Sequence, residues 1–250
     1  MKSFHSPRLI LIVGATAFAL AACSKSESPA PPAAKPSVAA APTPAPVQIT
    51  APAGTYTLDP YHSSISFGIN HLGLSNYVAR FTRYQATLNF DPANLAASSV
   101  TATIEPASVR TDFSGDYPAT HKDTPYKTFD EALAKDAKFF NSGAFPQITF
   151  TSKRVEQTAP GRFTITGDLG FLGKTLPVTL DTTVVGSVAA HPFTQIGAIG
   201  FSATTRIKRS EFGMTEYLQM LGDEVTIRFE GEFHQQAAAP AAAPAASPAS

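Results

Sequence analysis

Three polar side chains near the start of the predicted folded region could do chemistry. Asp59 and His62 are three residues apart, and His71 follows nine residues after His62. Imidazole and carboxylate groups bind transition metals, but the ligands must converge with fixed geometry. A spacing of nine residues, across a strand and a turn, is not typical of a metal site. We therefore predict no metal, and expect hydrogen bonds that hold the first strand, with His62 and His71 as candidate contacts for the polar group of a ligand.

Other residues that could support catalysis form no recognisable pattern. His121, His191 and His234 fall in predicted loops or near the end of the folded region. No serine lies in a Gly-x-Ser-x-Gly context, which exposes the nucleophile of many hydrolases, and glycine-rich phosphate loops are absent. The sequence thus predicts no catalytic residue, no enzyme activity and no cofactor.

Arg209 opens a polar stretch, residues 209–213, that permits two interpretations. Its guanidinium could contact the head group of a ligand at the opening of a barrel. Alternatively it could pin the last loop through an ion pair with Glu211, Asp223 or Glu224. We favour the second interpretation and keep Arg209 as a candidate head-group contact.

The N-terminal segment has the layout of a secretory signal. Lys2 and Arg8 precede an apolar run that is too short to span a bilayer comfortably. The run ends in Leu20-Ala21-Ala22-Cys23, which resembles the bacterial lipobox, in which the cysteine is lipidated. Cys23 is the single cysteine and cannot form an internal disulfide. We expect a lipoprotein signal peptide at 1–22 and lipidation of Cys23, the alternative being an ordinary signal peptide cleaved near Ala22.

Composition divides the remaining chain into three parts. Residues 23–53 and 236–250 are rich in Ala, Pro and Ser, which cannot bury enough apolar surface to order themselves, so we predict a disordered linker and a disordered tail. Residues 54–235 are left as one domain. The chain carries 19 basic and 19 acidic residues, and loss of Lys2 and Arg8 with the signal leaves a formal charge of −2. This balance does not favour a nucleic-acid partner.

Alternating apolar residues predict an all-β domain. In the stretch 161–185 two segments, each with one apolar face, flank the turn-like Leu172-Gly173-Lys174-Thr175, which predicts an antiparallel hairpin. Further segments alternate similarly, and the apolar parity switches between Phe81 and Tyr84, which predicts a bulge or a bend near residues 83–85. Short strands separated by turns favour a closed antiparallel barrel.

One segment has helical periodicity instead. Between Phe129 and Phe140 the apolar residues recur at helical spacing, and Thr128 with Glu131 can form an N-terminal cap. We predict a short amphipathic helix that closes one end of the barrel, the alternative being a helix packed on its outside.

Five motifs, in order along the chain, resemble those of the YceI-like domain family. They are Leu58-Asp59-x-x-His62-Ser63-x-Ile65-x-Phe67 with His71 and Arg80-Phe81; Phe139-Phe140-Asn141 with Phe145-Pro146-Gln147-Ile148-Thr149-Phe150-Thr151-Ser152; Gly167-Asp168-Leu169 with Gly173-Lys174-Thr175-Leu176-Pro177-Val178; Gly200-Phe201 leading to Arg209-Ser210-Glu211-Phe212-Gly213; and Gly222-Asp223-Glu224-Val225. The resemblance covers residues 55–233. Two departures, Phe129-Asp130-Glu131 in place of the frequent Arg-Asp and a longer loop at 111–128, fall where we expect the barrel mouth, and so bear on head-group preference.

The resemblance implies a lipocalin-like, eight-stranded antiparallel barrel that holds an isoprenoid chain, such as a polyprenol, a polyprenyl phosphate or an isoprenoid quinone. It also implies a periplasmic protein, which the lipobox would anchor to the membrane, and Ser24 after the cysteine suggests the outer membrane. We predict that the cavity is lined by Phe67, Ile69, Phe81, Ile104, Phe150, Ile165, Leu169, Val178, Phe201 and Phe229, with the small residues Gly167 and Ala203 leaving room for the chain. The alternatives are that these side chains pack a solid core, and that the protein is a ligand-free envelope scaffold or stress protein acting through a protein partner.

Overall fold

A computed structural model describes residues 47–236, and the predicted signal peptide, Cys23, most of the predicted linker and the tail beyond residue 236 lie outside this range. The elements are β1 (Gly54–His71), β2 (Ser75–Phe81), β3 (Tyr84–Phe90), η1 (Leu95–Ala97), β4 (Ser99–Ile104), η2 (Pro106–Ser108), β5 (Val109–Thr111), α1 (Tyr117–Thr120), α2 (Phe129–Lys135), β6 (Ile148–Ala159), β7 (Arg162–Phe171), β8 (Lys174–Val188), β9 (Ala198–Lys208) and β10 (Leu221–Gln235). Within the described range, neither helix has the length and apolar character needed to cross a bilayer.

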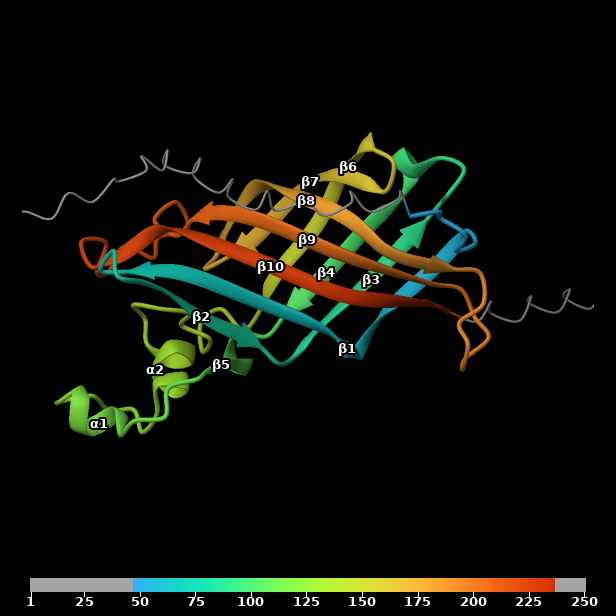
Figure 1. Ribbon diagram of the computed structural model, residues 1–250. Helices are drawn as coiled ribbons and strands as arrows, with labels where there is room; N and C mark the ends of the chain where they lie inside the picture. The colour runs from blue at the N-terminus through green and yellow to red at the C-terminus, as the bar shows by residue number, and fades with distance from the viewer. Residues whose placement is uncertain (1–46, 237–250) are drawn as a thin grey trace, which may run out of the picture. The chain divides into compact units, whose positions relative to one another are not determined.

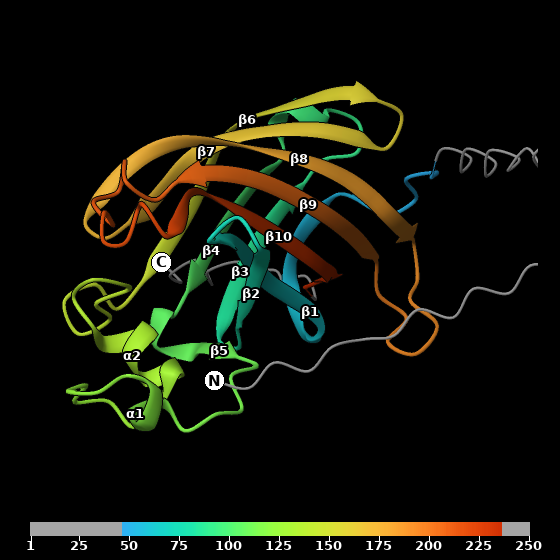
Figure 2. The same cartoon turned by 60° about the vertical axis from the view of Figure 1, so that its left-hand side comes forward.

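The strands form one antiparallel sheet that closes into a barrel, as the sequence predicted. Eight strands make the ring, in the order β10-β9-β8-β7-β6-β4-β3-β1, and pairing of β10 with β1 closes it (Figure 1). Strands β2 and β5 are additional: β2 pairs with β1, and β5 pairs with β2. Figure 2 shows the curved sheet of β6–β10 arching over the interior.

The predicted hairpin is the pair β7–β8, joined by Leu172 and Gly173. Both residues have positive φ, 48° and 76°, which matches the twist of the strands they connect. Gly173 adopts this conformation without strain, because it lacks a Cβ.

Strand β1 contributes to two different pairs because it contains a bulge. Its first half pairs with β3, with Tyr56 opposite Leu88, and its second half pairs with β2, with Ile65 opposite Phe81. Leu58 is opposite Phe233 and Ser63 is opposite Gly231, so residues 59–62 stand against the single residue Glu232. Such an insertion bends a strand and redirects its side chains.

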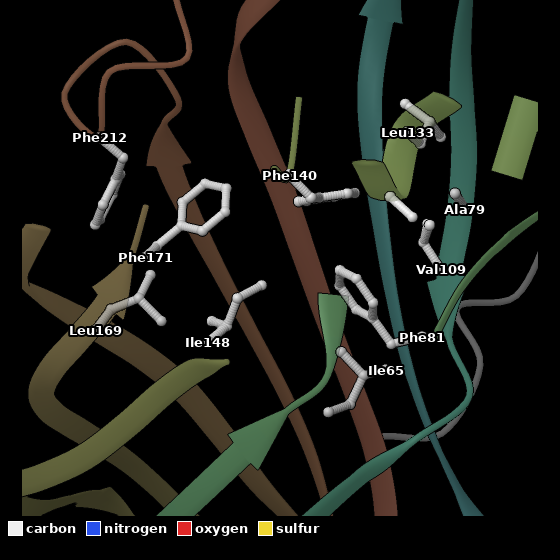
Figure 3. Packing of buried hydrophobic residues seen from close by; sticks show 11 residues of the cluster. Ile65, Ala79, Phe81, Val109, Leu133, Phe140, Ile148, Leu169, Phe171 and Phe212 are labelled. Carbon is white, nitrogen blue, oxygen red and sulfur yellow. The ribbon is translucent and has the colours of Figure 1, made fainter. Parts of the chain in front are cut away.

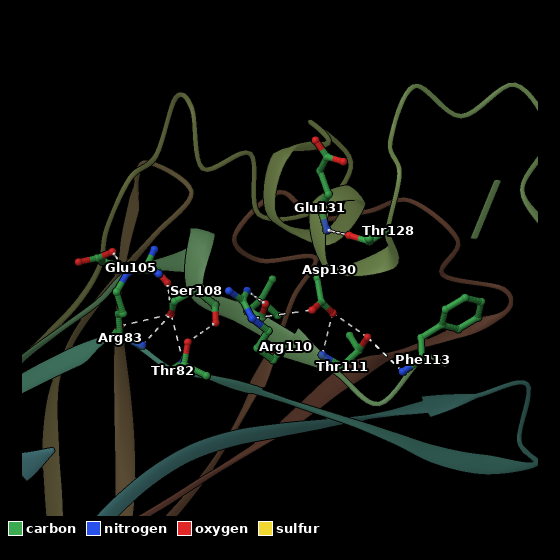
Figure 4. Close-up of polar contacts among 11 residues, drawn as sticks. Thr82, Arg83, Glu105, Ser108, Arg110, Thr111, Phe113, Thr128, Asp130 and Glu131 are labelled. Atoms are coloured by element: carbon green, nitrogen blue, oxygen red, sulfur yellow. Dashed lines mark hydrogen bonds and ion pairs between the residues drawn. The ribbon is translucent and has the colours of Figure 1, made fainter. Parts of the chain in front are cut away.

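The bend predicted near residues 83–85 separates β2 from β3, where the chain turns at Thr82 and Arg83. Buried Ser108 fixes this corner: its Oγ accepts a hydrogen bond from the Arg83 amide at 2.9 Å, and its carbonyl accepts one from the Thr82 hydroxyl at 3.0 Å (Figure 4). Because β5 lies at an edge of the sheet, the barrel wall is incomplete on this side.

Helix α2 covers that gap. Thr128 caps it by accepting a hydrogen bond from the Glu131 amide at 3.1 Å, as predicted. Asp130 ties the helix to β5, because its carboxylate accepts hydrogen bonds from the amide and the hydroxyl of Thr111 at 2.8 and 2.7 Å (Figure 4). The helix ends at Lys135, not at Phe140 as predicted, since Asp136 is extended and the Phe140 amide returns to the carbonyl of Leu133 at 3.1 Å.

Two apolar clusters occupy the interior. The first gathers side chains from the barrel strands and from α2, and Figure 3 shows Phe81 and Phe140 facing each other near Leu133. The ring centroids of Phe81 and Phe140 are 5.3 Å apart. The second cluster surrounds buried Tyr56 and Ile199 toward the other end of the strands. Leu133 of α2 is part of the interior, so the helix closes one end of the barrel.

Residues 47–53 correct the predicted linker boundary at residue 53. Ala51 is buried, and the amides of Thr50 and Ala51 donate hydrogen bonds to the Ser187 hydroxyl at 2.9 and 2.8 Å. Ile49 packs against the second cluster. Residues 47–53 therefore pack on the barrel, because a few apolar side chains within this Ala- and Pro-rich segment cover apolar surface there.

Candidate functional site: an apolar cavity inside the barrel

A cavity of about 520 Å³ lies inside the barrel and touches both apolar clusters. Its walls are almost wholly apolar, since alternate side chains of the ring strands point inward. This volume is in the range of small-molecule binding sites. The barrel is therefore not filled solidly by its own side chains.

The apolar residues predicted to line a cavity all do so. These are Phe67, Ile69, Phe81, Ile104, Phe150, Ile165, Leu169, Val178, Phe201 and Phe229. Their alternation along the strands was a sufficient signal, because side chains of one parity face one side of a sheet. Contact of these residues with a ligand stays a prediction.

The two small inward residues differ from each other. Ala203 lines the cavity directly. Gly167 shares the inward parity of Ile165 and Leu169, but a Cβ there would lie 2.6 Å from the Phe150 ring and 2.5 Å from the Thr151 carbonyl oxygen. Its role is thus to admit the ring of Phe150 against the strand, and the space above it is not free for a ligand.

The structure separates the two histidines predicted as head-group contacts. His71 ends β1 and lines the cavity. His62 lies outside the cavity, with an exposed ring whose Nδ1 is 2.7 Å from a carboxylate oxygen of Asp59. The predicted hydrogen bonding of His62 and Asp59 is thus present. Burial opposes ionisation of Asp59, but the hydrogen bonds from His62 and the Tyr61 amide outweigh it and lower the Asp59 pKa.

Arg209 is 2% exposed and clasps the loop between β9 and β10. Its guanidinium donates hydrogen bonds to the carbonyls of Gly222, Met214, Glu216 and Leu221, at 2.9, 3.0, 2.7 and 3.0 Å. The predicted pinning of this loop is present, but backbone carbonyls and not carboxylates are the partners. Burial lowers the pKa of Arg209, and the charge of Asp223 opposes that effect. Arg209 also borders the cavity, so its contact with a head group stays a prediction.

Three polar residues at the cavity wall were not predicted. The hydroxyls of Tyr77 and Thr182 are buried and have no hydrogen-bond partner among residues 47–236. Burial raises the pKa of Tyr77, and the nearby side chain of Thr111 opposes that effect. His121 also lines the cavity and stacks on Tyr117, with ring centroids 4.2 Å apart. Inward parity could have identified Tyr77, which alternates with Phe81, and Thr182, whereas His121 lies on a loop segment without periodicity.

A closed antiparallel barrel around an apolar cavity defines a lipocalin-like fold. The YceI-like domain model matches residues 56–233, and the chain belongs to this family. The predicted family is therefore confirmed.

Named relatives and solved structures agree with this placement. Protein YceI of Escherichia coli O157:H7 is 33% identical over 189 residues, covering 75% of this chain and 90% of the relative. A UPF0312 protein of Yersinia enterocolitica is 34% identical over 180 residues, covering 71% and 85%. The crystal structure of Burkholderia cenocepacia BcnA is similar with a TM-score of 0.56 and 25% identity, covering 70% of this chain and 98% of BcnA. The Campylobacter jejuni YceI protein gives a TM-score of 0.55 and 28% identity, covering 67% and 90%.

Proposed function

We propose that this protein binds one isoprenoid chain, such as a polyprenol, a polyprenyl phosphate or an isoprenoid quinone, inside the barrel. The observation that carries the proposal is the apolar cavity of about 520 Å³, which touches both apolar clusters and therefore suits a long chain. Membership of the YceI-like family supports it.

The driving force is burial of hydrocarbon. Each buried methylene contributes about 0.8 kcal/mol, so a tail of ~15 carbons gains roughly 12 kcal/mol before ordering costs are subtracted. Aromatic rings from several strands supply much of the wall, for example Phe67, Phe150 and Phe201. Such a site needs no catalytic group.

The polar end of the ligand belongs at the end of the barrel where β1 meets β2. His71, Tyr77 and His121 line the cavity there, and His71 and His121 are exposed to solvent. The Tyr77 hydroxyl lacks a partner among the described residues, and a buried hydroxyl without a partner is costly. A ligand oxygen accepting a hydrogen bond from Tyr77 would satisfy it.

The proposal includes a periplasmic location with a lipid anchor at Cys23, most consistent with the outer membrane. Its support is the sequence pattern that ends at Cys23. Globomycin, which blocks the signal peptidase of lipoproteins, should make the precursor accumulate. Processing that continues unchanged in Cys23→Ala would refute the anchor without bearing on the cavity.

A ligand-free scaffold is the competing function, and the cavity argues against it. A scaffold would have a filled interior and a large apolar patch on its outside. Exposed apolar side chains do gather at the tip formed by the β1–β2 turn and the neighbouring β9–β10 loop. The Leu72 amide of the turn donates a hydrogen bond to the Met220 carbonyl of the loop at 2.7 Å. This tip lies at the His71 end of the barrel, where β1 meets β10, and so fits a carrier that exchanges lipid with a bilayer.

Native mass spectrometry tests the proposal directly. The folded body, residues 47–236, is produced without the proposed anchor and purified from its bacterial host without detergent, and co-purifying material is extracted with organic solvent. A mass excess that matches a polyprenol, its phosphate or a quinone would support the proposal and identify the ligand. A bare mass, with no uptake of geranylgeraniol in vitro, would refute it. Equal uptake of stearic acid would show a general lipid binder and refute the isoprenoid assignment.

A further inference from the structure

A second cluster of functional side chains lies outside the cavity, near the C-terminal end of β10. Glu232 and His234 are two residues apart on β10 and therefore project to the same, outer face of the sheet. His191 comes from the loop between β8 and β9, which Figure 1 places beside the end of β10. The rings of His191 and His234 have centroids 5.0 Å apart.

The donor atoms of these three residues are close enough to share one ion. One ligand atom each from His191, Glu232 and His234 lie within 4.8 Å of one another. Two donor atoms bound to one zinc ion at about 2.0–2.1 Å can be at most about 4.2 Å apart. Small side-chain rotations therefore suffice to bring these donor atoms to bonding distance of one ion.

The bulge of β1 brings a further pair to the same carboxylate. Residues 59–62 stand opposite Glu232, and ligand atoms of Asp59, His62 and Glu232 also lie within 4.8 Å of one another. Asp59 fixes the ring of His62 through its contact with Nδ1 at 2.7 Å. A carboxylate that holds one ring nitrogen of a histidine in this way is a common outer partner in metal sites.

The environment of His234 is the strongest single piece of evidence for a metal site. The Nε2 of His234 is buried and has no hydrogen-bond partner within residues 47–236, and it lies 3.6 Å from a carboxylate oxygen of Glu232. A buried ring nitrogen without a partner is costly, and coordination to an ion would satisfy it. On His191, Nδ1 is 3.4 Å from the amides of Phe193 and Thr194, so binding there exchanges two long hydrogen bonds for one coordinate bond.

We propose that His191, Glu232 and His234 bind one divalent transition-metal ion, with its fourth position facing the Asp59–His62 pair. Two imidazoles and one carboxylate suit Zn²⁺, Ni²⁺ or Cu²⁺ and not Mg²⁺, which prefers oxygen ligands. The ion would join the β8–β9 loop to β10 near its seam with β1. The proposed site differs from the expectation of no metal. That expectation arose because neither the spacing of residues 191, 232 and 234 nor the bulge at 59–62 forms a recognisable sequence motif. The site is separate from the cavity and does not depend on the proposed ligand.

Titration calorimetry with ZnCl₂ tests the site in the full chain, prepared without a histidine tag. We expect one ion per chain, binding at least about tenfold weaker in His191→Ala and in Glu232→Gln, and no binding of MgCl₂. His121→Ala is the matched control and should bind like the parent. Zn²⁺ should also raise the thermal unfolding temperature of the parent and of His121→Ala, but not that of His191→Ala.

Two results would overturn the proposal. The first is the absence of Zn²⁺ binding by the parent, and the second is equal binding by folded His191→Ala. If the second result is accompanied by loss of binding in His62→Ala, the ion lies on Asp59 and His62 instead.

Discussion

Ala203 offers a sharp test of the cavity, because its side chain is buried, faces inward from β9 and lines the cavity. Ala203→Phe adds a ring of about six carbons to the wall. If the ring takes the place of an equal number of ligand carbons, at about 0.8 kcal/mol each, the loss is about 5 kcal/mol. Since about 1.4 kcal/mol corresponds to a factor of ten, we expect geranylgeraniol to bind up to about three-thousandfold more weakly.

The assay is a native mass-spectrometry titration of parent and variant with geranylgeraniol, with thermal unfolding to establish that each is folded. Ser202→Phe places the same ring on the outer face of the neighbouring position and should bind like the parent. Val178→Phe, which also narrows the cavity, provides a second test from β8 if Ala203→Phe does not fold. Parental affinity in two folded cavity variants would refute the placement of the ligand inside the barrel.

Three further outcomes can be measured. Tyr77→Phe should leave the free energy of unfolding unchanged or raise it by up to about 1 kcal/mol, because it removes a buried hydroxyl without a partner. The same substitution should weaken binding of geranylgeraniol but not of a hydrocarbon that lacks the alcohol. Unchanged relative affinities for the two ligands would exclude Tyr77 as a head-group contact. Asp59→Asn should lower the pKa of His62 in an NMR titration, because the hydrogen bond and charge of Asp59 raise it. In the parent, the Asp59–His62 pair stabilises the fold most at pH values between the lowered pKa of Asp59 and the raised pKa of His62. This contribution falls as pH rises through the pKa of His62, and it also falls as pH drops through the pKa of Asp59. Arg209→Leu should lower the free energy of unfolding in urea by about 3–5 kcal/mol, because it leaves buried carbonyls without donors.

Arg206→Leu is the control for Arg209→Leu. Arg206 is exposed and pairs with Glu224 at 3.6 Å, so its loss should cost about 0–1 kcal/mol. Equal effects of the two substitutions would refute the structural role assigned to Arg209. An unchanged His62 pKa in Asp59→Asn would contradict the pairing at the bulge.

Alternation of apolar residues was enough to predict the strands and the cavity wall. Phe163, Ile165 and Leu169 share one parity of β7, and in a closed sheet the side chains of that parity form part of the inner surface. The same rule located the bend between Phe81 and Tyr84, where parity changes. These features depend on neighbours along the chain and are therefore visible in it.

Features that depend on contacts between distant segments were not predictable in this way. The loop carbonyls that satisfy Arg209 carry no side-chain signal, because any residue supplies a carbonyl. The end of α2 at Lys135 follows from a turn that returns Phe140 to the interior, although the apolar spacing continues past it. Gly167 shows the same limit: its small size serves the neighbouring ring of Phe150, which only the paired strand reveals.

The seam between β1 and β10 joins nearly the two extremes of the folded chain, with Tyr56 opposite Gln235. While the last strand is still being synthesised, the cavity lacks one wall, and a bound chain would be open to water along its length. Contacts between segments so far apart form slowly, since the intervening chain must first be ordered. Under the proposed function, lipid loading would therefore follow completion of the barrel, and a truncation before Leu221 would remove the cavity itself.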